Sequence, residues 1–176
     1  MLISRQRGVS LIETMMAVVI MVVLVVMGLP SFSAFLQNRK VRNATEAIHN
    51  GLSLAKAEAV RRNTIVAFNL SANRSWSLTC TNCADTLPSM PATEIPAEIA
   101  ISTSATPLVL NFNGFGKVTS LSDGSTSVIN ISNSNGTCEK DGGSIRCLRI
   151  IVAPGGQIRS CDPRLTDTNP SSPQAC

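Results

Sequence analysis

The sequence predicts an α+β fold in which one long N-terminal helix packs on a C-terminal antiparallel β-sheet domain. Three observations support this prediction. Residues 9–29 form an apolar run with a single charge, residues 30–62 continue with apolar side chains at helical spacing, and residues 63–176 break into short β-prone runs separated by turns. A length of 176 residues allows one domain of ordinary size in addition to the helix.

The first segment, residues 9–29, is long enough to cross a membrane. At a rise of about 1.5 Å per residue it makes a helix of about 31 Å, which matches the hydrocarbon layer. A basic leader, residues 1–8, precedes it, as in a secretory signal peptide. However, the apolar run is longer than a signal-peptide core, and it continues into Pro30 and phenylalanines instead of a small-residue cleavage site. We therefore expect a single-pass membrane helix.

The single charge in this run is Glu13. An ionised carboxylate in lipid costs several kcal/mol unless it is paired, so Glu13 is expected to have a functional partner. The simpler alternative is that the helix end lies at the membrane interface, where Glu13 reaches water.

The stretch Gly8-Val9-Ser10-Leu11-Ile12-Glu13 resembles the prepilin peptidase site of type IV pilins and type II secretion pseudopilins, usually G-F-T-L-I-E. Gly8 and Glu13 match it in identity and spacing, whereas Val9 replaces the usual phenylalanine. The resemblance implies that the leader is cut after Gly8 and that the new amino terminus on Val9 is N-methylated. It also implies that Glu13 pairs with the amino terminus of a neighbouring subunit during filament assembly.

Residues 30–62 are expected to continue the helix as an amphipathic half that ends near Arg62. Pro30 closely follows Gly28, and because proline removes a helical hydrogen bond we predict a kink or a local melt near residues 28–30. Pilins commonly have proline at this position. One apolar stripe is expected to face the domain core, formed by Val41, Ala44, Ile48, Leu52, Ala55 and Ala59.

Residues 63–176 are expected to form a β-rich globular head. Gly114 and Gly116 flank Phe115 in a tight connection between strands. The predicted strands cover residues 64–70, 74–80, 99–103, 108–113, 127–132, 145–152 and 156–161.

Six cysteines lie in the head and none lies in the helix, which indicates an oxidising compartment and up to three disulfides. Fifteen pairings are possible. Proximity along the chain favours three local bonds, of which the last would tie down a tail, residues 166–175, that has little means of ordering itself. The favoured pairs are Cys80 with Cys83, Cys138 with Cys147, and Cys161 with Cys176.

Catalytic and metal-binding functions find little support. Cys80 and Cys83 have the spacing of a redox or zinc motif, but there is no second Cys-x-x-Cys, and the only histidine is His49 in the helical stretch. We therefore expect no catalytic residue, no metal, no cofactor and no enzyme activity.

The head has its own resemblance. Residues 108–118, 145–152 and 154–161 are similar to the C-terminal half of the FimT/GspH group of minor pilins and pseudopilins. Some members of the FimT branch bind DNA through a Gly-Arg-x-Arg segment, which here reads Gly156-Gln157-Ile158-Arg159. Asp162 and Asp167 cancel charge in the tail, and no aromatic residue is interleaved for base stacking. The possible contacts to duplex DNA are Arg146, Arg149, Arg159 and Arg164.

The resemblance implies a minor pilin with a pilin-like fold, incorporated at or near the tip of a type IV pilus, where it helps to prime assembly. Before assembly the chain would span the bacterial inner membrane with a periplasmic head, and afterwards it would belong to the filament. Its expected partners are other pilin or pseudopilin subunits, prepilin peptidase and the inner membrane. Two alternatives stay open: an H-type minor pseudopilin of type II secretion, and a DNA-binding minor pilin for uptake in natural transformation.

Overall fold

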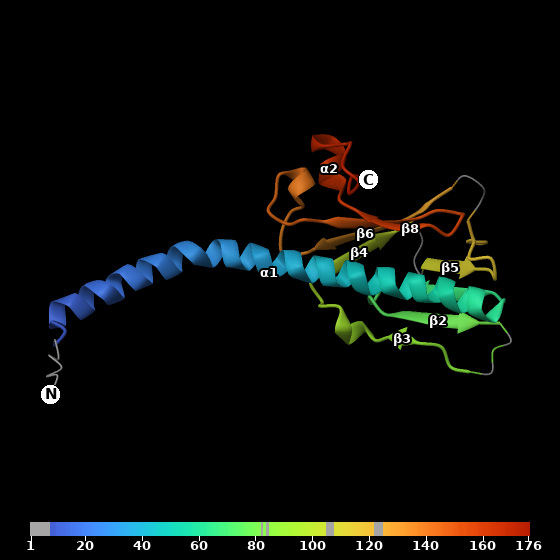
Figure 1. The fold of residues 1–176 in the computed structure, drawn as a ribbon, viewed down its shortest axis with the longest axis horizontal. Helices are drawn as coiled ribbons and strands as arrows, with labels where there is room; N and C mark the ends of the chain where they lie inside the picture. The colour runs from blue at the N-terminus through green and yellow to red at the C-terminus, as the bar shows by residue number, and fades with distance from the viewer. Residues whose placement is uncertain (1–7, 82, 84, 105–107, 122–124) are drawn as a thin grey trace, which may run out of the picture. The chain divides into compact units, whose positions relative to one another are not determined.

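The computed structural model describes residues 8–81, 83, 85–104, 108–121 and 125–176, and for residues 28–31 it describes only the helical backbone. The chain divides into two compact units, Met1–Leu36 and Gln37–Cys176. The long helix α1 (Leu11–Arg62) contributes to both units, and we call the second unit the head (Figure 1).

Helix α1 begins two residues later than predicted and ends where predicted. The carbonyl of Ser10 accepts hydrogen bonds from the backbone N–H groups of Glu13 and Thr14, at 3.0 and 3.2 Å. At the other end, Asn63 adopts a left-handed conformation with φ of 49°, and the N–H of Thr64 donates to the carbonyl of Ala59.

The helix is continuous through residues 28–30, so the alternative of local melting there is wrong. At Gly28 and Pro30 the structure describes the backbone alone. The kink at this position therefore stays a prediction.

The head contains two four-stranded antiparallel sheets, where the sequence had suggested only an antiparallel sheet domain. The first has the order β3-β2-β1-β5 and the second the order β4-β6-β7-β8. The seven predicted strands are present, whereas the two-residue β3 was missed because it lies in a proline-rich stretch. The strands are β1 (Val66–Leu70), β2 (Trp76–Cys80), β3 (Ser89–Met90), β4 (Ile99–Thr103), β5 (Leu108–Phe112), β6 (Ser127–Asn133), β7 (Leu148–Val152) and β8 (Ile158–Cys161).

A single apolar core joins both sheets to α1. All six residues of the predicted helical stripe are buried in it, and the inward-facing residues of the strands complete it. The rings of Phe68 and Trp76 have centroids 5.8 Å apart and close one side of this core. They lie directly against Gly51, because a Cβ placed there would come within 2.7 Å of Trp76 and 2.9 Å of Phe68.

The six cysteines form the three local disulfides that proximity favoured: Cys80–Cys83, Cys138–Cys147 and Cys161–Cys176. The tail between Cys161 and Cys176 is more ordered than expected. It contains the short helix α2 (Pro163–Thr168), which is capped by the Asp162 side chain accepting from the backbone N–H of Arg164. Aspartate at the N-cap followed by proline at the first helical position is a sequence signal for a helix start, and it was overlooked.

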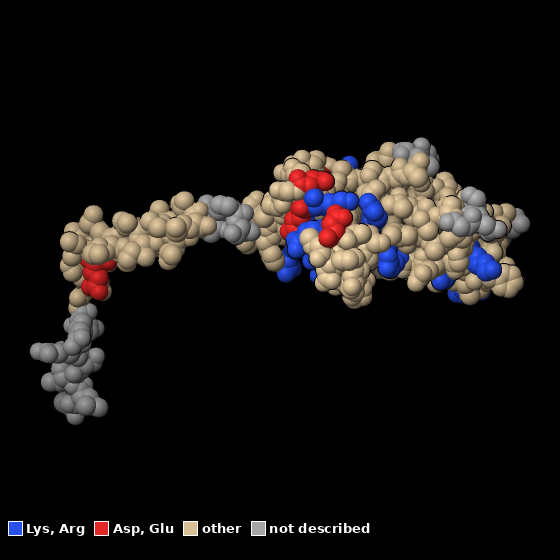
Figure 2. Space-filling view, turned by 90° about the horizontal axis from the view of Figure 1, so that it is seen from above, with Lys and Arg blue, Asp and Glu red and all other residues tan. Residues whose placement is uncertain are grey.

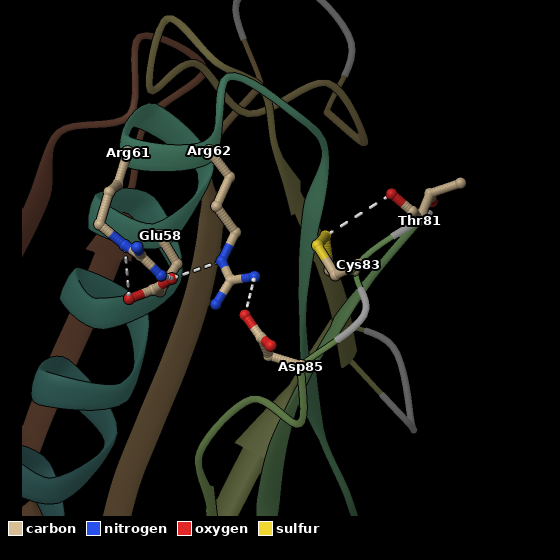
Figure 3. Close-up of polar contacts among 7 residues, drawn as sticks. Glu58, Arg61, Arg62, Thr81, Cys83 and Asp85 are labelled. Carbon is tan, nitrogen blue, oxygen red and sulfur yellow. Dashed lines mark hydrogen bonds and ion pairs between the residues drawn. A yellow bond between two sulfur atoms is a disulfide. The ribbon is translucent and has the colours of Figure 1, made fainter.

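Two groups of ion pairs tie α1 to loops of the head. Glu98, in the loop before β4, pairs with Lys40, whose ammonium lowers the pKa of the Glu98 carboxyl. At the C-terminal end of α1, Glu58 accepts from Arg61 at 2.7 Å and from Arg62 at 2.8 Å (Figure 3). These two guanidinium groups hold the pKa of Glu58 below its usual value. Arg62 also reaches Asp85 at 3.3 Å.

Replacing Gly51 with alanine should destabilise the head, although alanine is the better helix former. Overpacking against two rigid rings costs about 1–3 kcal/mol, and the gain in helix propensity returns about 1 kcal/mol at most. We expect a net loss in the free energy of unfolding of up to about 2 kcal/mol. Urea denaturation of the head from Gln37 onward measures it, with the exposed Asn50→Ala as the control. An increase in stability for Gly51→Ala would contradict the packing described here.

The stability of the head should fall below about pH 4.5, the ordinary pKa of a glutamate. Glu58 and Glu98 have depressed folded-state pKa values, so their stabilisation is complete above the unfolded-state value and is lost as the pH falls through the folded-state values. Glu58→Gln combined with Glu98→Gln should flatten the change in melting temperature between pH 7 and pH 3. Glu94→Gln, at an exposed position, is the matched control and should leave the profile unchanged.

Candidate assembly site and the arginine surface of the head

The Gly8–Val9 peptide bond lies in exposed, non-helical chain immediately before α1. Val9 is 67% exposed, and a Cβ built on Gly8 would meet no atom within 4 Å. Helical hydrogen bonding starts only at the carbonyl of Ser10. Because the bond is exposed and lies outside the helix, it is accessible to an enzyme that would cut between Gly8 and Val9.

Glu13 lies in the first turn of α1, where a carboxylate interacts favourably with the helix dipole. Its side chain is exposed, and no ion pair links it to any residue that the structure describes. The geometry therefore leaves the carboxylate available for a cation from outside the chain.

The apolar side chains around Glu13 are exposed on every face of the helix. From Val9 to Met27 the large ones are between 51 and 80% exposed. By length and composition α1 can cross a membrane. Exposed apolar surface of this extent requires lipid or other apolar chains around it.

The four arginines named as possible DNA contacts lie in the segment before β7, in β7, in β8 and in α2, and two of them form ion pairs with carboxylates. Arg146 donates through Nε to the buried carboxylate of Asp162 at 2.6 Å. Arg164 pairs with Glu139. Glu139 was missed in the sequence because it lies 25 positions from its partner, and it belongs to the loop that the Cys138–Cys147 bond closes.

Arg149 and Arg159 are placed on the same face of the second sheet, because Arg149 stands opposite Cys161 and Arg159 opposite Ile151. The Nε of Arg149 donates to Asn130 at 2.7 Å, and Nη2 of Arg159 donates to the carbonyl of Cys176 at 3.4 Å.

A pocket of about 220 Å³ lies beside Arg149, and its lining includes Arg164 and three carboxylates as well as Lys140. Basic and acidic side chains are accordingly mixed on the face of the head drawn in Figure 2. The structure brings Arg149 and Arg164 to one pocket, and Arg146 and Arg159 are not among the described residues that line it.

The sequence also offered candidate metal-binding and nucleophilic residues. Among the described residues there is no cluster of three or more His, Cys, Asp or Glu side chains that could hold a metal ion. Cys80 and Cys83 are bonded to each other, and His49 is half-buried on α1.

Two family models match the sequence. The model described as Type II transport protein GspH matches residues 44–156, and the prokaryotic N-terminal methylation motif matches residues 3–29. No curated protein matches the chain.

Solved structures resemble the fold. The type IV minor pilin FimU of Pseudomonas aeruginosa PAO1 aligns with a TM-score of 0.54 at 16% identity, covering 71% of this chain and 90% of FimU. The minor pseudopilin EpsH of the Vibrio cholerae type II secretion system aligns with a TM-score of 0.50 at 10% identity, covering 70% of this chain and 98% of EpsH.

At these identities the structural likeness shows a shared fold, which confirms the predicted pilin-like α+β architecture. The two family models cover both halves of the molecule, the methylation motif at the N-terminus and the GspH region over the head. The chain therefore belongs to the GspH family and is a minor pilin or pseudopilin of a type IV pilus or a type II secretion system.

Proposed function

We propose that the chain is a minor pilin of a type IV pilus, cut by prepilin peptidase after Gly8 and incorporated at or near the filament tip, where it helps to prime assembly. The observation that supports this role is the N-terminal half of α1. Its Glu13 carboxylate has no ion pair among the described residues, its apolar side chains are exposed on all faces, and an exposed Gly8–Val9 bond precedes it. The role is structural, with no reaction to catalyse.

The assembly step follows from charge in a medium of low dielectric constant. Cleavage after Gly8 creates an ammonium group on Val9, which N-methylation keeps cationic. In lipid or in an apolar filament core, this group and the Glu13 carboxylate of a neighbouring subunit attract each other strongly, and each removes the desolvation penalty of the other. The apolar faces of the helices exchange lipid for one another as the subunit enters the filament.

Before assembly the apolar half of α1 would span the inner membrane, with the head on the periplasmic side. Three disulfides in the head suit that oxidising compartment. The proposed partners are other pilin-family subunits, prepilin peptidase and the inner membrane.

An H-type minor pseudopilin of type II secretion is the alternative within the same family. Affinity purification of the full-length chain, with mass spectrometry of the subunits that accompany it, separates the two. Pilus subunits support the proposal, and secretion-system subunits replace it with the pseudopilin.

Binding of duplex DNA stays a prediction, and the pairing of Arg146 with Asp162 and of Arg164 with Glu139 reduces the charge available for it.

Processing should yield a mature chain that begins at Val9 with a methylated amino group. Intact-mass analysis of membrane-extracted protein from cells with prepilin peptidase measures this directly. Gly8→Val should stay unprocessed, and because a Cβ at position 8 meets nothing, any such loss reflects recognition by the peptidase and not misfolding. Full-length protein from competent cells would contradict the cleavage site.

Changing Glu13 to alanine should leave membrane insertion intact and reduce entry into filaments about tenfold or more, because the partner of the new amino terminus is removed. A tenfold change corresponds to about 1.4 kcal/mol, a modest value for a charge pair in an apolar medium. Quantitative immunoblots of sheared filaments and of membranes measure the two pools. Thr14→Ala, on the same exposed turn, is the control, and equal filament entry by both variants would exclude the pairing.

A further inference from the structure

The loop of residues 113–117 follows β5 and is closed by a β-bridge between Phe112 and Val118, and it presents one aromatic side chain almost entirely to solvent. Phe115 is 86% exposed, whereas the other exposed large apolar side chains described in the head, Val60, Ile65 and Val109, are between 40 and 49% exposed. A phenylalanine in this state forgoes the stabilisation that burial would bring.

The loop that carries Phe115 is held rigidly by hydrogen bonds. The Asn113 side chain accepts from the backbone N–H groups of Phe115 and Lys117, at 3.1 and 3.0 Å. The backbone N–H of Asn113 donates to the carbonyl of Lys117 at 2.9 Å, and that of Gly116 donates to the carbonyl of Asn113 at 2.8 Å. Gly116 has a φ of +74°, which favours glycine.

Close packing on two neighbouring elements fixes the loop further. A Cβ on Gly114 would lie 2.3 Å from the Asn63 side chain, and one on Gly116 would lie 2.9 Å from Lys56, so the loop rests on the last turns of α1. The turn between β7 and β8 closes over it, since a Cβ on Gly156 would come within 1.7 Å of the Gly116 carbonyl. Phe115 is therefore preorganised, and burying it in a partner would require little further ordering.

The surroundings of Phe115 carry excess positive charge. At the C-terminal end of α1, Arg61 forms an ion pair with Glu58, and Arg62 forms ion pairs with Glu58 and Asp85 (Figure 3). Lys117 is exposed, and the Lys56 ammonium donates to the carbonyl of Gly156 at 2.9 Å. No carboxylate among the described residues pairs with either lysine, so a complementary surface would be acidic.

The loop lies far along α1 from the start of the head. The head portion of α1 starts at Gln37, and Val60, beside the loop, lies 23 residues further along the helix. At about 1.5 Å per residue this places Val60, and with it the base of the loop, roughly 35 Å along α1 from the start of the head.

We infer that Phe115 is the anchor of a contact between subunits, and that it inserts into an apolar pocket edged by carboxylates on the head of another pilin-family subunit. This inference rests on the proposed function, because it requires the chain to be assembled beside other subunits. A single rigid aromatic ring flanked by cations has the character of the residues that dominate protein interfaces.

The test uses the full-length chain in cells that assemble the filament. Phe115 is replaced by the photoreactive p-benzoylphenylalanine, with the same replacement at Val109 as the control, and crosslinked products are identified by mass spectrometry. We expect a crosslink from position 115 to the head of another pilin-family subunit, and none from position 109. A crosslink from position 115 only to lipid or to nucleic acid, or no crosslink, overturns the inference.

A second measurement uses variants that keep the fold. Phe115→Ser should retain processing, membrane insertion and melting temperature, while recovery of the partner subunit in affinity purification falls about tenfold or more. Lys117→Glu should lower recovery severalfold, and Val109→Ser should not change it. If Phe115→Ser recovers the partner as the unsubstituted chain does while Glu13→Ala fails to enter filaments, the inference fails and the proposed function stands. If the unsubstituted chain recovers no pilin-family subunit, the proposed function fails as well.

Discussion

Burial of one narrow stripe of α1 is the interaction on which the head depends. The stripe combines small and branched residues, so that Ala44, Ala55 and Ala59 allow the strands to approach while Ile48 and Leu52 fill the space between them. Neither four-stranded sheet has an apolar core of its own, because both place their inward side chains in the same cluster as the helix. Two sheets with separate strand orders are thereby joined into one cooperative unit.

In its first half the same helix exposes its apolar side chains instead of burying them. There the apolar side chains surround the helix completely, and none of the residues that the structure describes covers them. An isolated molecule of this protein is consequently incomplete in water, and its N-terminal half is stable only among lipids or among other apolar helices. Membership of the GspH family accounts for both environments, since a pilin or pseudopilin passes from membrane to filament.

Local signals in the sequence predicted much of this architecture, and non-local ones did not. The helix end at Arg62, the buried stripe, the three disulfide pairs and the turn around Phe115 all follow from residues close together in the chain. The division into two sheets and the pairing of Arg164 with Glu139 depend on contacts between distant segments, which no spacing rule encodes. The tail helix α2 had a local signal in Asp162 and Pro163, but the polar composition of the tail concealed it.

The disulfides have a mechanical consequence. Their partners are separated by 3, 9 and 15 positions, so each bond closes a loop within one short segment. None of them joins α1 to a strand or one sheet to the other. Tension transmitted along a filament through α1 is therefore borne by non-covalent packing in the core, and the covalent links only limit how far each loop can extend once that packing yields. The force at which the head unfolds is thus set by the strength of packing between the helical stripe and the two sheets.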